Sequence, residues 1–341
     1  MKTIKNSKIF YGWWVVLGCV LITTTMVPPI MSLSNKFLIP VSMMVTNWFV
    51  EKRGIAMSVT MAGIGLGGTI FSPIVTNLLQ NYGWRHTYLI MAGIILVVAL
   101  PVALFVLKKS PEQMGLKAYG AEKQAANNAK QGTKKQGVLI SVKESKTKLF
   151  FLLMIVGMLA NGIINSGALG QFPPALEELH GASVQAAIIS LYSLVGIFGK
   201  IFIGWINDKF GVVVSATYGC IMFGLAFVFM LLGQNTNMLY IMAVVFGFGN
   251  AIGTVIPPLV TSEVFGMEKY PEAYGMVNSA TQVGLSLGSL LVASMYDLNG
   301  SYTLAWMLLL VLTAVTLFSW VGSCIVAKRY MASDVKLKQA Q

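Results

Sequence analysis

Long apolar runs separated by short polar segments make up most of the chain. Runs of about 20 apolar residues are long enough to cross the roughly 30 Å hydrocarbon core of a bilayer as helices. The pattern therefore predicts an all-α, polytopic membrane helix bundle of about ten helices. The runs lie at about residues 10–29, 55–79, 87–107, 149–171, 184–206, 212–233, 238–260, 274–296 and 303–327, with a shorter one at 37–50.

One segment between these runs has a different composition. Residues 108–148 are rich in Lys, Gln, Asn, Gly and Ala and lack a periodic apolar face. Such a composition cannot bury enough surface to fold alone, so we expect a mobile, basic cytoplasmic linker. The predicted organisation is a truncated N-terminal membrane half at 1–107, this linker at 108–148, a C-terminal six-helix half at 149–327 and a cytoplasmic tail at 328–341.

Composition and charge support a membrane protein. Of the 341 residues, 56% are hydrophobic and only 11% are charged, which leaves too few charges to coat soluble domains. The net charge of +12 comes from cations gathered near the N-terminus, at Lys52 and Arg53, in the linker and in the tail. Because Lys and Arg gather on the cytoplasmic side, both termini are expected inside a plasma membrane, which we expect to be bacterial. No basic face interleaved with aromatics indicates nucleic acid as a partner.

The two membrane halves resemble each other. Ile39 and Pro40 are echoed by Ile256 and Pro257, and further along Glu51-Lys52 is echoed by Glu268-Lys269. Parallel repeats of this kind are typical of one large transporter architecture. In the second half, Phe172 and Met276 are 276 − 172 = 104 positions apart, whereas their counterparts Phe37 and Met57 are 57 − 37 = 20 apart. The first half is therefore short by 104 − 20 = 84 residues, which corresponds to two helices and the front of a third, with the joint near 40–42.

The start of the chain allows two topologies. Cytoplasmic Lys2 to Lys8 and cytoplasmic Lys52-Arg53 require an even number of crossings between them. We favour a tight hairpin, in which 10–28 cross outward, Pro28-Pro29 turn, and 31–50 cross back. The alternative is a re-entrant half-crossing at 37–50, which is tolerated only where protein covers it.

Three motifs carry a resemblance to a known family. They are Tyr11-Gly12-Trp13-Trp14-Val15-Val16, the stretch from Trp48 to Ala56 that continues through Ala62-Gly63, and the loop Gly204-Trp205-Ile206-Asn207-Asp208-Lys209-Phe210-Gly211. With them the chain resembles the major facilitator superfamily, and within it the monocarboxylate transporter and oxalate/formate antiporter branch. The resemblance implies two six-helix halves that rock about a central cavity. The chain departs from it where two helices of the first half are lacking.

Lys200 is the main candidate for substrate contact. It lies inside an apolar run, where a charge is costly unless it faces a cavity or a partner. The resemblance implies a cation at this place in the eighth helix, which would hold a substrate carboxylate by charge-assisted hydrogen bonds. The alternative is that Lys200 snorkels to the nearby cytoplasmic surface.

Polar residues inside the runs are weaker candidates for substrate contact. Amides and hydroxyls in a membrane bundle commonly serve helix packing instead. The candidates in the first half are Thr23, Thr24 and Thr25. Those in the second half are Asn161, Asn165, Ser166, Tyr192, Asn278, Ser279 and Gln282.

The second-half loop motif has a predicted mechanical role. The resemblance implies that Asp208 latches the halves in one state by pairing with a basic residue or a helix start, while Gly204 and Gly211 allow close approach and a sharp turn. In the alternative interpretation Asp208 and Lys209 form an ordinary solvated loop.

Other patterns give no sign of catalysis. The glycines at 63–68 and 247–253 lack the strand, loop and following Lys of a phosphate-binding loop, and we expect them to serve helix packing. Pro28-Pro29 and Pro257-Pro258 are expected at helix ends. The only histidines, His86 and His180, fall at predicted exterior loops, and the three cysteines lie in apolar runs. We expect no enzyme, no metal and no cofactor.

The sequence thus predicts a secondary transporter of small organic anions, monocarboxylate-like, that works by alternating access, with the antiporter mode among its expectations. The alternative is a transport-inactive, internally deleted relative that acts only as a membrane interaction protein or is a gene fragment. The 84-residue deficit motivates this second interpretation.

Overall fold

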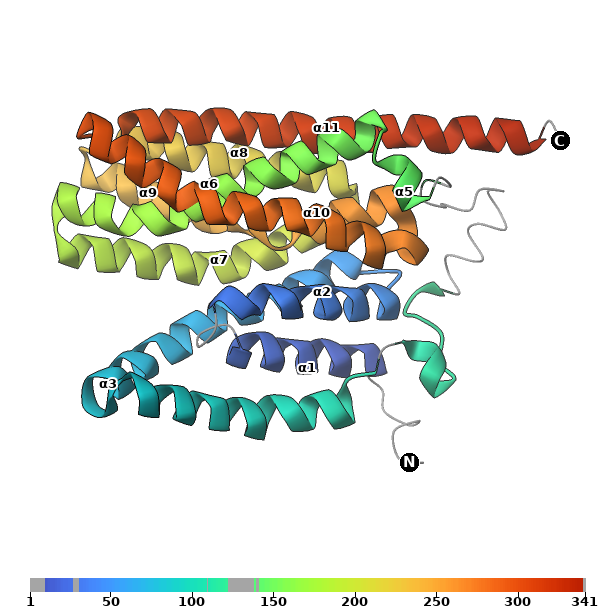
Figure 1. Cartoon of the computed structure of the whole chain (residues 1–341), viewed down its shortest axis with the longest axis horizontal. Coiled ribbons are helices and arrows are strands. Elements are labelled where there is room, and N and C mark those ends of the chain that lie inside the picture. The colour runs from blue at the N-terminus through green and yellow to red at the C-terminus, as the bar shows by residue number, and fades with distance from the viewer. Residues whose placement is uncertain (1–9, 27–30, 109, 122–137, 139–140, 340–341) are drawn as a thin grey trace. The chain divides into compact units, whose positions relative to one another are not determined.

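The computed structural model describes residues 10–26, 31–108, 110–121, 138 and 141–339. Pro28 and Pro29, predicted to turn the hairpin, lie outside these residues. The chain divides into two compact units, Met1–Lys134 and Lys135–Gln341, and the division falls within the expected linker. Each unit is described by itself (Figure 1).

Unit 1 contains four helical segments among its described residues. They are α1 (Tyr11–Met26), α2 (Met31–Trp48) and the two arms of α3 (Arg53–Pro101), which continues as a π-helix, η2 (Val102–Val106). The arms of α3 meet at Gly83, whose φ of 69° and ψ of 172° suit only glycine. One candidate membrane span, Asn81–Val106, lies here, and Tyr11–Thr25 is a shorter apolar helix.

Helices α1 and α2 run antiparallel (Figure 1). At one end of unit 1, the ring of Trp48 lies 5.3 Å from that of Tyr11 and 6.0 Å from that of Phe10. The Tyr11 hydroxyl donates to the Val106 carbonyl (2.9 Å), and Trp48 Nε1 donates to the Lys108 carbonyl (2.8 Å). The start of α1 and the end of α2 therefore meet, as the hairpin requires. Helix α2 has 18 residues and a length of about 27 Å, but it is not among the candidate membrane spans of the described residues, because it is not apolar enough.

Small and hydroxyl residues join α1 to the first arm of α3. The hydroxyls of Thr23 and Thr24 donate across to the carbonyls of Thr60 (3.0 Å) and Gly63 (3.1 Å). A Cβ on Gly67 would collide with the backbone of Thr24, so this glycine allows the helices to touch. The threonines and glycines of this half thus serve helix packing, as membrane helices commonly use them.

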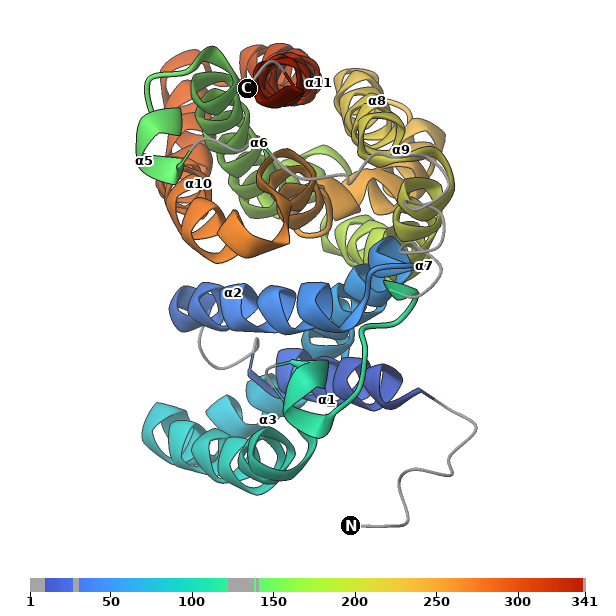
Figure 2. The same cartoon turned by 90° about the vertical axis from the view of Figure 1, so that its right-hand side faces the viewer.

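Unit 2 contains six helical crossings, formed by α6 (Leu149–His180), α7 (Ala182–Phe210), α8 (Val212–Leu231), α9 (Thr236–Gly249), α10 (Ile256–Asn299) and α11 (Thr303–Gln339). Figure 2 looks nearly along these helices. Helix α10 holds two crossings because Gly266, at φ 69° and ψ 178°, turns the chain within it. The fourth crossing, Thr236–Gly266, combines α9, a 3-10 turn and the first arm of α10. With the four segments of unit 1, the described residues form ten long helical segments, seven of which are long and apolar enough to cross a membrane.

Two features of unit 2 position the helices. Gly162, Gly284 and Gly288 let α6 and α10 touch, because a Cβ on any of them would meet the backbone of the other helix. Buried aromatic rings fill the centre of the unit, with Phe172 lying 5.0 Å from Phe246 and 5.3 Å from Trp306. All three cysteines of the chain are buried and free.

The linker is more ordered than its composition predicts. It contains a 3-10 turn, η3 (Pro111–Met114), and a short helix, α5 (Val142–Ser145), which Ser141 and Glu144 cap reciprocally. Tyr119 pairs with Phe49 as an isolated β-bridge in unit 1, and Val138 is 1% exposed in unit 2. These described residues correct the expectation of a wholly mobile segment, because single apolar side chains dock on each unit. In the segment expected as the tail, α11 continues as a helix to Gln339.

Candidate functional site

The fourth crossing of unit 2 is interrupted near its middle. Between α9 and α10 lies a 3-10 turn, η4 (Asn250–Gly253), followed by Thr254 at φ −126°. The Thr254 amide donates to the Ala251 carbonyl at 3.2 Å as in a 3-10 turn, and the Val255 amide donates to the same carbonyl at 2.8 Å, so the helix is locally distorted here. Discontinuous membrane helices free backbone groups near the midplane, and transporters use such breaks to bind substrates and ions. The start of α10 at Ile256 agrees with the helix end predicted for Pro257-Pro258.

One face of α7 packs against this break. A Cβ on Gly199 would collide with the Gly247 carbonyl, and a Cβ on Gly196 would lie 3.6 Å from Asn250 Nδ2. Lys200 is four residues after Gly196 and therefore lies on the same face of the helix. It is 6% exposed, and about 15 Å of helix separates it from the end of α7 at Phe210. This buried position differs from the snorkelling alternative.

Tyr192 extends the same face of α7 by two turns. It is buried, and its ring lies 5.1 Å from the ring of Phe246 on α9 in an edge-to-face arrangement. Gly247 packs against the Tyr192 carbonyl and the Val195 side chain. Tyr192 and Lys200 are thus both positioned on α7 by its contact with α9.

An asparagine pair on α6 approaches the break from another side. Asn165 Nδ2 donates to the Oδ1 (2.9 Å) and the carbonyl (2.8 Å) of Asn161, one turn earlier. A Cβ on Gly253 would collide with the Asn165 amide, so the break and this side chain are in contact. Asn161 is 1% exposed, and its Nδ2 has no protein partner, as is also true of the buried Thr254 hydroxyl. Buried polar groups without partners are costly, and they mark a place where a ligand or water can bind.

Asn278 and Gln282 lie on the second arm of α10. They are one helical turn apart and both half-buried. Other predicted polar residues serve packing or face outward. The Ser166 hydroxyl accepts from the amide of Ser289 (3.3 Å), which ties α6 to α10, and Ser279 is exposed.

Helix α7 ends at Gly211, the second glycine of the loop motif, where a sharp turn was predicted. Gly211, at φ 88°, caps the helix through its amide, which donates to the Asn207 carbonyl (2.9 Å). Lys209 Nζ lies 5.0 Å from the ring centre of Trp205 and 5.2 Å from that of Phe210. The lysine therefore makes cation–π contacts within its own motif.

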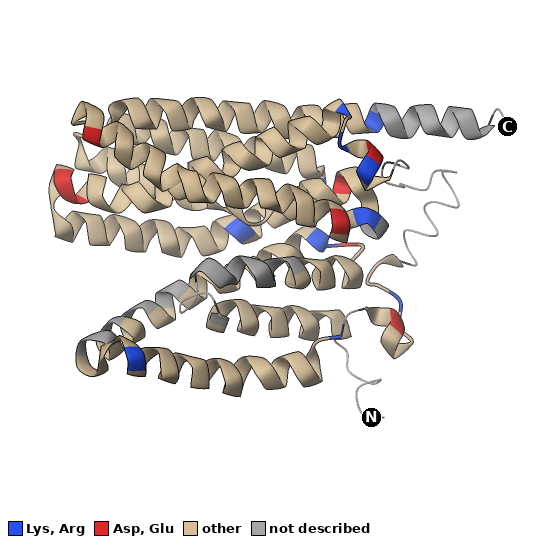
Figure 3. Cartoon of the chain, viewed as in Figure 1, with Lys and Arg blue, Asp and Glu red and all other residues tan. Residues whose placement is uncertain are grey.

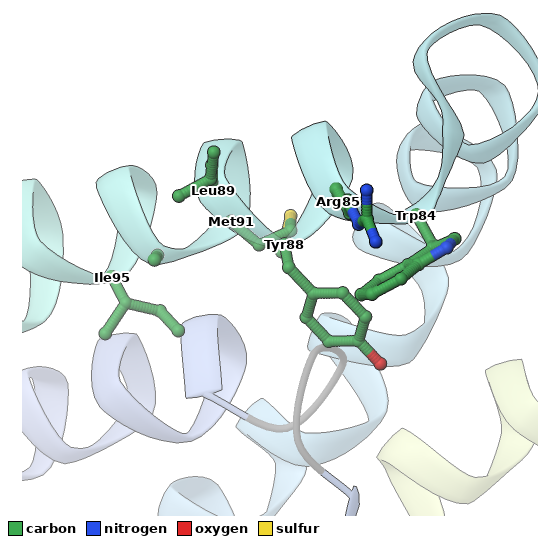
Figure 4. Close-up of a pocket in the computed structure, with 7 residues that line it drawn as sticks. Trp84, Arg85, Tyr88, Leu89, Met91 and Ile95 are labelled. Carbon is green, nitrogen blue, oxygen red and sulfur yellow. The ribbon is translucent and has the colours of Figure 1, made fainter.

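A separate hollow lies on the second arm of α3 in unit 1 (Figure 4). One helix supplies its lining, with Trp84 and Tyr88 on the same side and their rings 6.4 Å apart. The Arg85 guanidinium lies 5.0 Å from the Trp84 ring centre. This hollow contains none of the residues predicted to bind substrate.

Sequence reasoning missed two members of the site, Asn250 and Thr254. Gly253 was expected only to pack helices, and its neighbour is in fact a side-chain amide. The available signal was the concentration of Gly, Asn and Thr just before Pro257-Pro258 within an apolar run. In the part of the chain that the structure describes, no group of three or more His, Cys, Asp or Glu is placed to hold a metal ion.

These features define a polytopic, all-α membrane bundle with one broken helix and a buried cation. The family model of the Major Facilitator Superfamily matches the chain over residues 30–211 and again over 154–336. The chain therefore belongs to this superfamily, which is a family of transporters and not of enzymes.

The chain is also similar to curated transporters. The chain is 26% identical over 297 residues to Monocarboxylate transporter 12-B of Danio rerio, covering 79% of this chain and 60% of that protein. It is 27% identical over 246 residues to the uncharacterized MFS-type transporter YhjX of Escherichia coli (strain K12), covering 71% of this chain and 56% of that protein. The chain thus spans about 60% of the length of the curated relatives it matches.

Solved structures share the fold. The MFS transporter FucP in its outward conformation superposes with a TM-score of 0.58 at 12% identity, over 93% of this chain and 84% of that one. The human organic anion transporter MFSD10 superposes with a TM-score of 0.61 at 14% identity, over 91% and 82%. At this identity the likeness shows the fold alone.

Proposed function

We propose that the chain is a secondary transporter of small organic anions, of the monocarboxylate type, that works by alternating access. The observation that carries this proposal is Lys200, a cation buried beside a broken helix in the middle of the membrane bundle. Cations inside a membrane bundle commonly mark substrate and ion pathways. A carboxylate ligand would bind Lys200 through charge-assisted hydrogen bonds.

The surrounding polar groups support an anion that also carries a hydroxyl or carbonyl. Asn161 offers an unused amide donor, and Asn165 and Thr254 border the same break. We propose Asn161, Asn165 and Tyr192 as further substrate contacts, with Asn278 and Gln282 on the α10 arm as outer members of the site. The names of relatives such as Monocarboxylate transporter 12-B agree with this substrate class.

Uptake of labelled lactate, oxalate and formate into vesicles containing the full chain tests the proposal. Lys200→Ala should reduce uptake by about tenfold or more, because its charge-assisted contact is lost. Lys200→Arg should retain part of the rate, and Lys143→Ala provides a control, because Lys143 is an exposed cation on α5, outside the proposed site and the loop motif. Equal uptake by wild type and Lys200→Ala would remove Lys200 from the mechanism.

A second candidate is a transport-inactive membrane interaction protein. It is favoured by unit 1, which has four described helical segments where unit 2 has six. In its candidate span Asn81–Val106, only 11% of residues are buried, against 39% in Thr303–Lys328. Anion binding by the purified chain, measured by calorimetry, without flux into vesicles would favour this second function.

The orientation of the chain is part of the proposal. In unit 2, cations gather at the end of the helices where the linker enters (Figure 3). We place this end, both termini and the loop with Gly204, Asp208, Lys209 and Gly211 on the cytoplasmic side, where Asp208 would latch the halves. Reporter fusions after Gln341 and after Leu298 should report opposite sides of the membrane.

A further inference from the structure

The end of unit 2 remote from the linker carries a second hollow, which we call the distal pocket. It has a volume of about 140 Å³, smaller than the roughly 300–1,000 Å³ of drug-sized sites, so it has room only for a small ligand. The ends of α6, α8 and α10 and the starts of α9 and α11 surround it. Its lining includes Glu178, Gln234, Tyr296, Tyr302 and Trp306.

Three aromatic rings form one wall of the distal pocket. Tyr296 and Tyr302 stack with ring centres 4.3 Å apart, and Tyr302 and Trp306 stack at 5.4 Å. The Tyr302 hydroxyl donates to Gln171 Oε1 at 3.5 Å, which helps to fix its ring. Trp306 is 3% exposed, so the wall is anchored in the core of the unit. The ring faces that this stack leaves open attract cations, whereas the faces between the stacked rings are occupied.

The charge at this end of unit 2 has one sign. Glu177, Glu178 and Asp297 lie here, and the described segments 171–182, 229–240 and 294–306 contain no Lys or Arg. Figure 3 shows acidic residues at this end and the cations at the other. Glu178 lines the pocket together with Tyr296, so its carboxylate lies close to the aromatic wall.

The neighbouring histidine is fixed by two contacts. His180 Nε2 lies 2.7 Å from the Gly233 carbonyl, and its Nδ1 lies 3.3 Å from the Thr236 hydroxyl. The pKa of Tyr302 is raised by its partial burial and by the carboxylates of Glu178 and Asp297, which places the ring within their field.

We propose that the distal pocket binds a small organic cation, with the ammonium group against the rings of Tyr296 and Tyr302 and Glu178 as its counter-ion. The ligand class follows from the combination of an aromatic wall with a single sign of charge. The same carboxylates repel organic anions, so this pocket differs in ligand class from the site at Lys200. The proposal does not depend on transport, because every residue it uses lies at one end of unit 2.

Choline binding to the full chain in detergent, measured by calorimetry, tests this proposal. The uncharged isostere 3,3-dimethylbutan-1-ol serves as the ligand control, because it keeps the shape and lacks the charge. We expect choline to bind at least about tenfold more tightly than the alcohol, since only the cation gains from the rings and the carboxylate.

Variants assign the binding to the pocket. Glu178→Gln should weaken choline binding by about tenfold, whereas Glu177→Gln should not, because Glu177 does not line the pocket. Tyr302→Phe keeps the ring and should retain binding, and Tyr302→Ala should abolish it. The proposal is overturned if choline fails to bind at up to about 50 mM, if the alcohol binds equally well, or if the two glutamate variants behave alike.

Discussion

The two loops that the sequence repeat makes equivalent each hold one end of the linker, by different chemistry. The repeat pairs positions at an offset of 268 − 51 = 217, so Trp48 corresponds to Phe265. In unit 1 the amides of Val50 and Glu51 donate to the Tyr119 carbonyl, and the Tyr119 amide donates to the Trp48 carbonyl. In unit 2 the Val138 amide donates to the Val264 carbonyl (3.1 Å), and Lys269 Nζ donates to the Val138 carbonyl (3.0 Å).

The difference between these two sets of linker contacts shows how much of the structure a sequence repeat determines. In both loops a linker residue forms backbone hydrogen bonds, because carbonyl groups are exposed where one helix ends and the next begins. Unit 1 adds an aromatic cluster, in which the rings of Phe49 and Tyr119 lie 5.7 Å apart. Unit 2 instead uses the side chain of Lys269, whose counterpart Lys52 is at 6.0 Å from the Tyr119 ring centre. The repeat conserves the place of the contact, and the neighbouring side chains decide its chemistry.

The largest expected effect comes from deleting the ring at the end of each loop. Trp48 and Phe265 are both buried, and replacement of either by Ala should cost about 3–5 kcal/mol. Trp48→Ala should cost about 1 kcal/mol more, since its hydrogen bond to Lys108 is also lost. Thermal unfolding in detergent measures both losses.

Trp48→Phe is the control for this pair, because it removes the hydrogen bond and keeps a ring. It should recover most of the stability that Trp48→Ala loses. A larger loss for Phe265→Ala than for Trp48→Ala would contradict the greater role given to the aromatic cluster of unit 1.

The turns of the two loops should respond to substitution with opposite sign. Gly266 has φ 69° and ψ 178°, a region open essentially to glycine, so Gly266→Ala should destabilise by about 1–3 kcal/mol. Lys52 has φ 59° and ψ 28°, where a side chain is disfavoured by about 1–2 kcal/mol. Lys52→Gly should therefore leave stability unchanged or raise it slightly, less the loss of its contact with Tyr119.

Unfolding midpoints of these two variants, measured side by side, test the expected signs. Gly275→Ala, at a helical glycine where a Cβ would meet nothing within 4 Å, controls for the added methyl group. If Lys52→Gly lost as much stability as Gly266→Ala, the expectation that the backbone of Lys52 is strained would be wrong.

The smallest expected effect is the difference in stability between substitutions of Lys269 and of Lys52. Lys269→Met removes a hydrogen bond to the Val138 carbonyl and should cost about 1 kcal/mol. Lys52→Met removes only an exposed cation–π contact of about 0.5–1 kcal/mol, and the backbone bonds to Tyr119 remain. Amide hydrogen exchange should accelerate at Val138 in the first variant and hardly change at Tyr119 in the second. Equal acceleration of amide exchange at Val138 and Tyr119 would contradict the conclusion that the two loops hold the linker by different interactions.

Much of the fold was predictable because lipid imposes a simple rule on the sequence. Each apolar run must form a helix long enough to cross the bilayer, so most helices of unit 2 begin and end within several residues of the predicted limits, whereas α6 and α11 extend 180 − 171 = 9 and 339 − 327 = 12 residues beyond them. Two deviations are instructive. Helix α6 continues through Pro173 and Pro174 to His180, and Pro40 lies inside α2, because neighbouring helices can accommodate a missing amide donor.

The candidate site was predictable only in part. The cost of a charge in an apolar run pointed to Lys200 directly. The pattern did not show that Asn165 touches Gly253 or that the helix breaks at Asn250, because both depend on which helices become neighbours. The repeated pair Ile39-Pro40 and Ile256-Pro257 shows that the same residues can have different local structures. The first pair lies within a helix, and the second begins one.

The sequence by itself determined the membrane environment, the ten helices, the superfamily resemblance and the internal repeat. These follow from local composition, because the bilayer acts on every run in the same way. Only the tertiary structure decided which polar groups meet at the broken helix, how each loop holds the linker, and that Glu178 faces an aromatic wall. Such contacts join residues far apart in the chain, and their energies depend on close packing that no local pattern records.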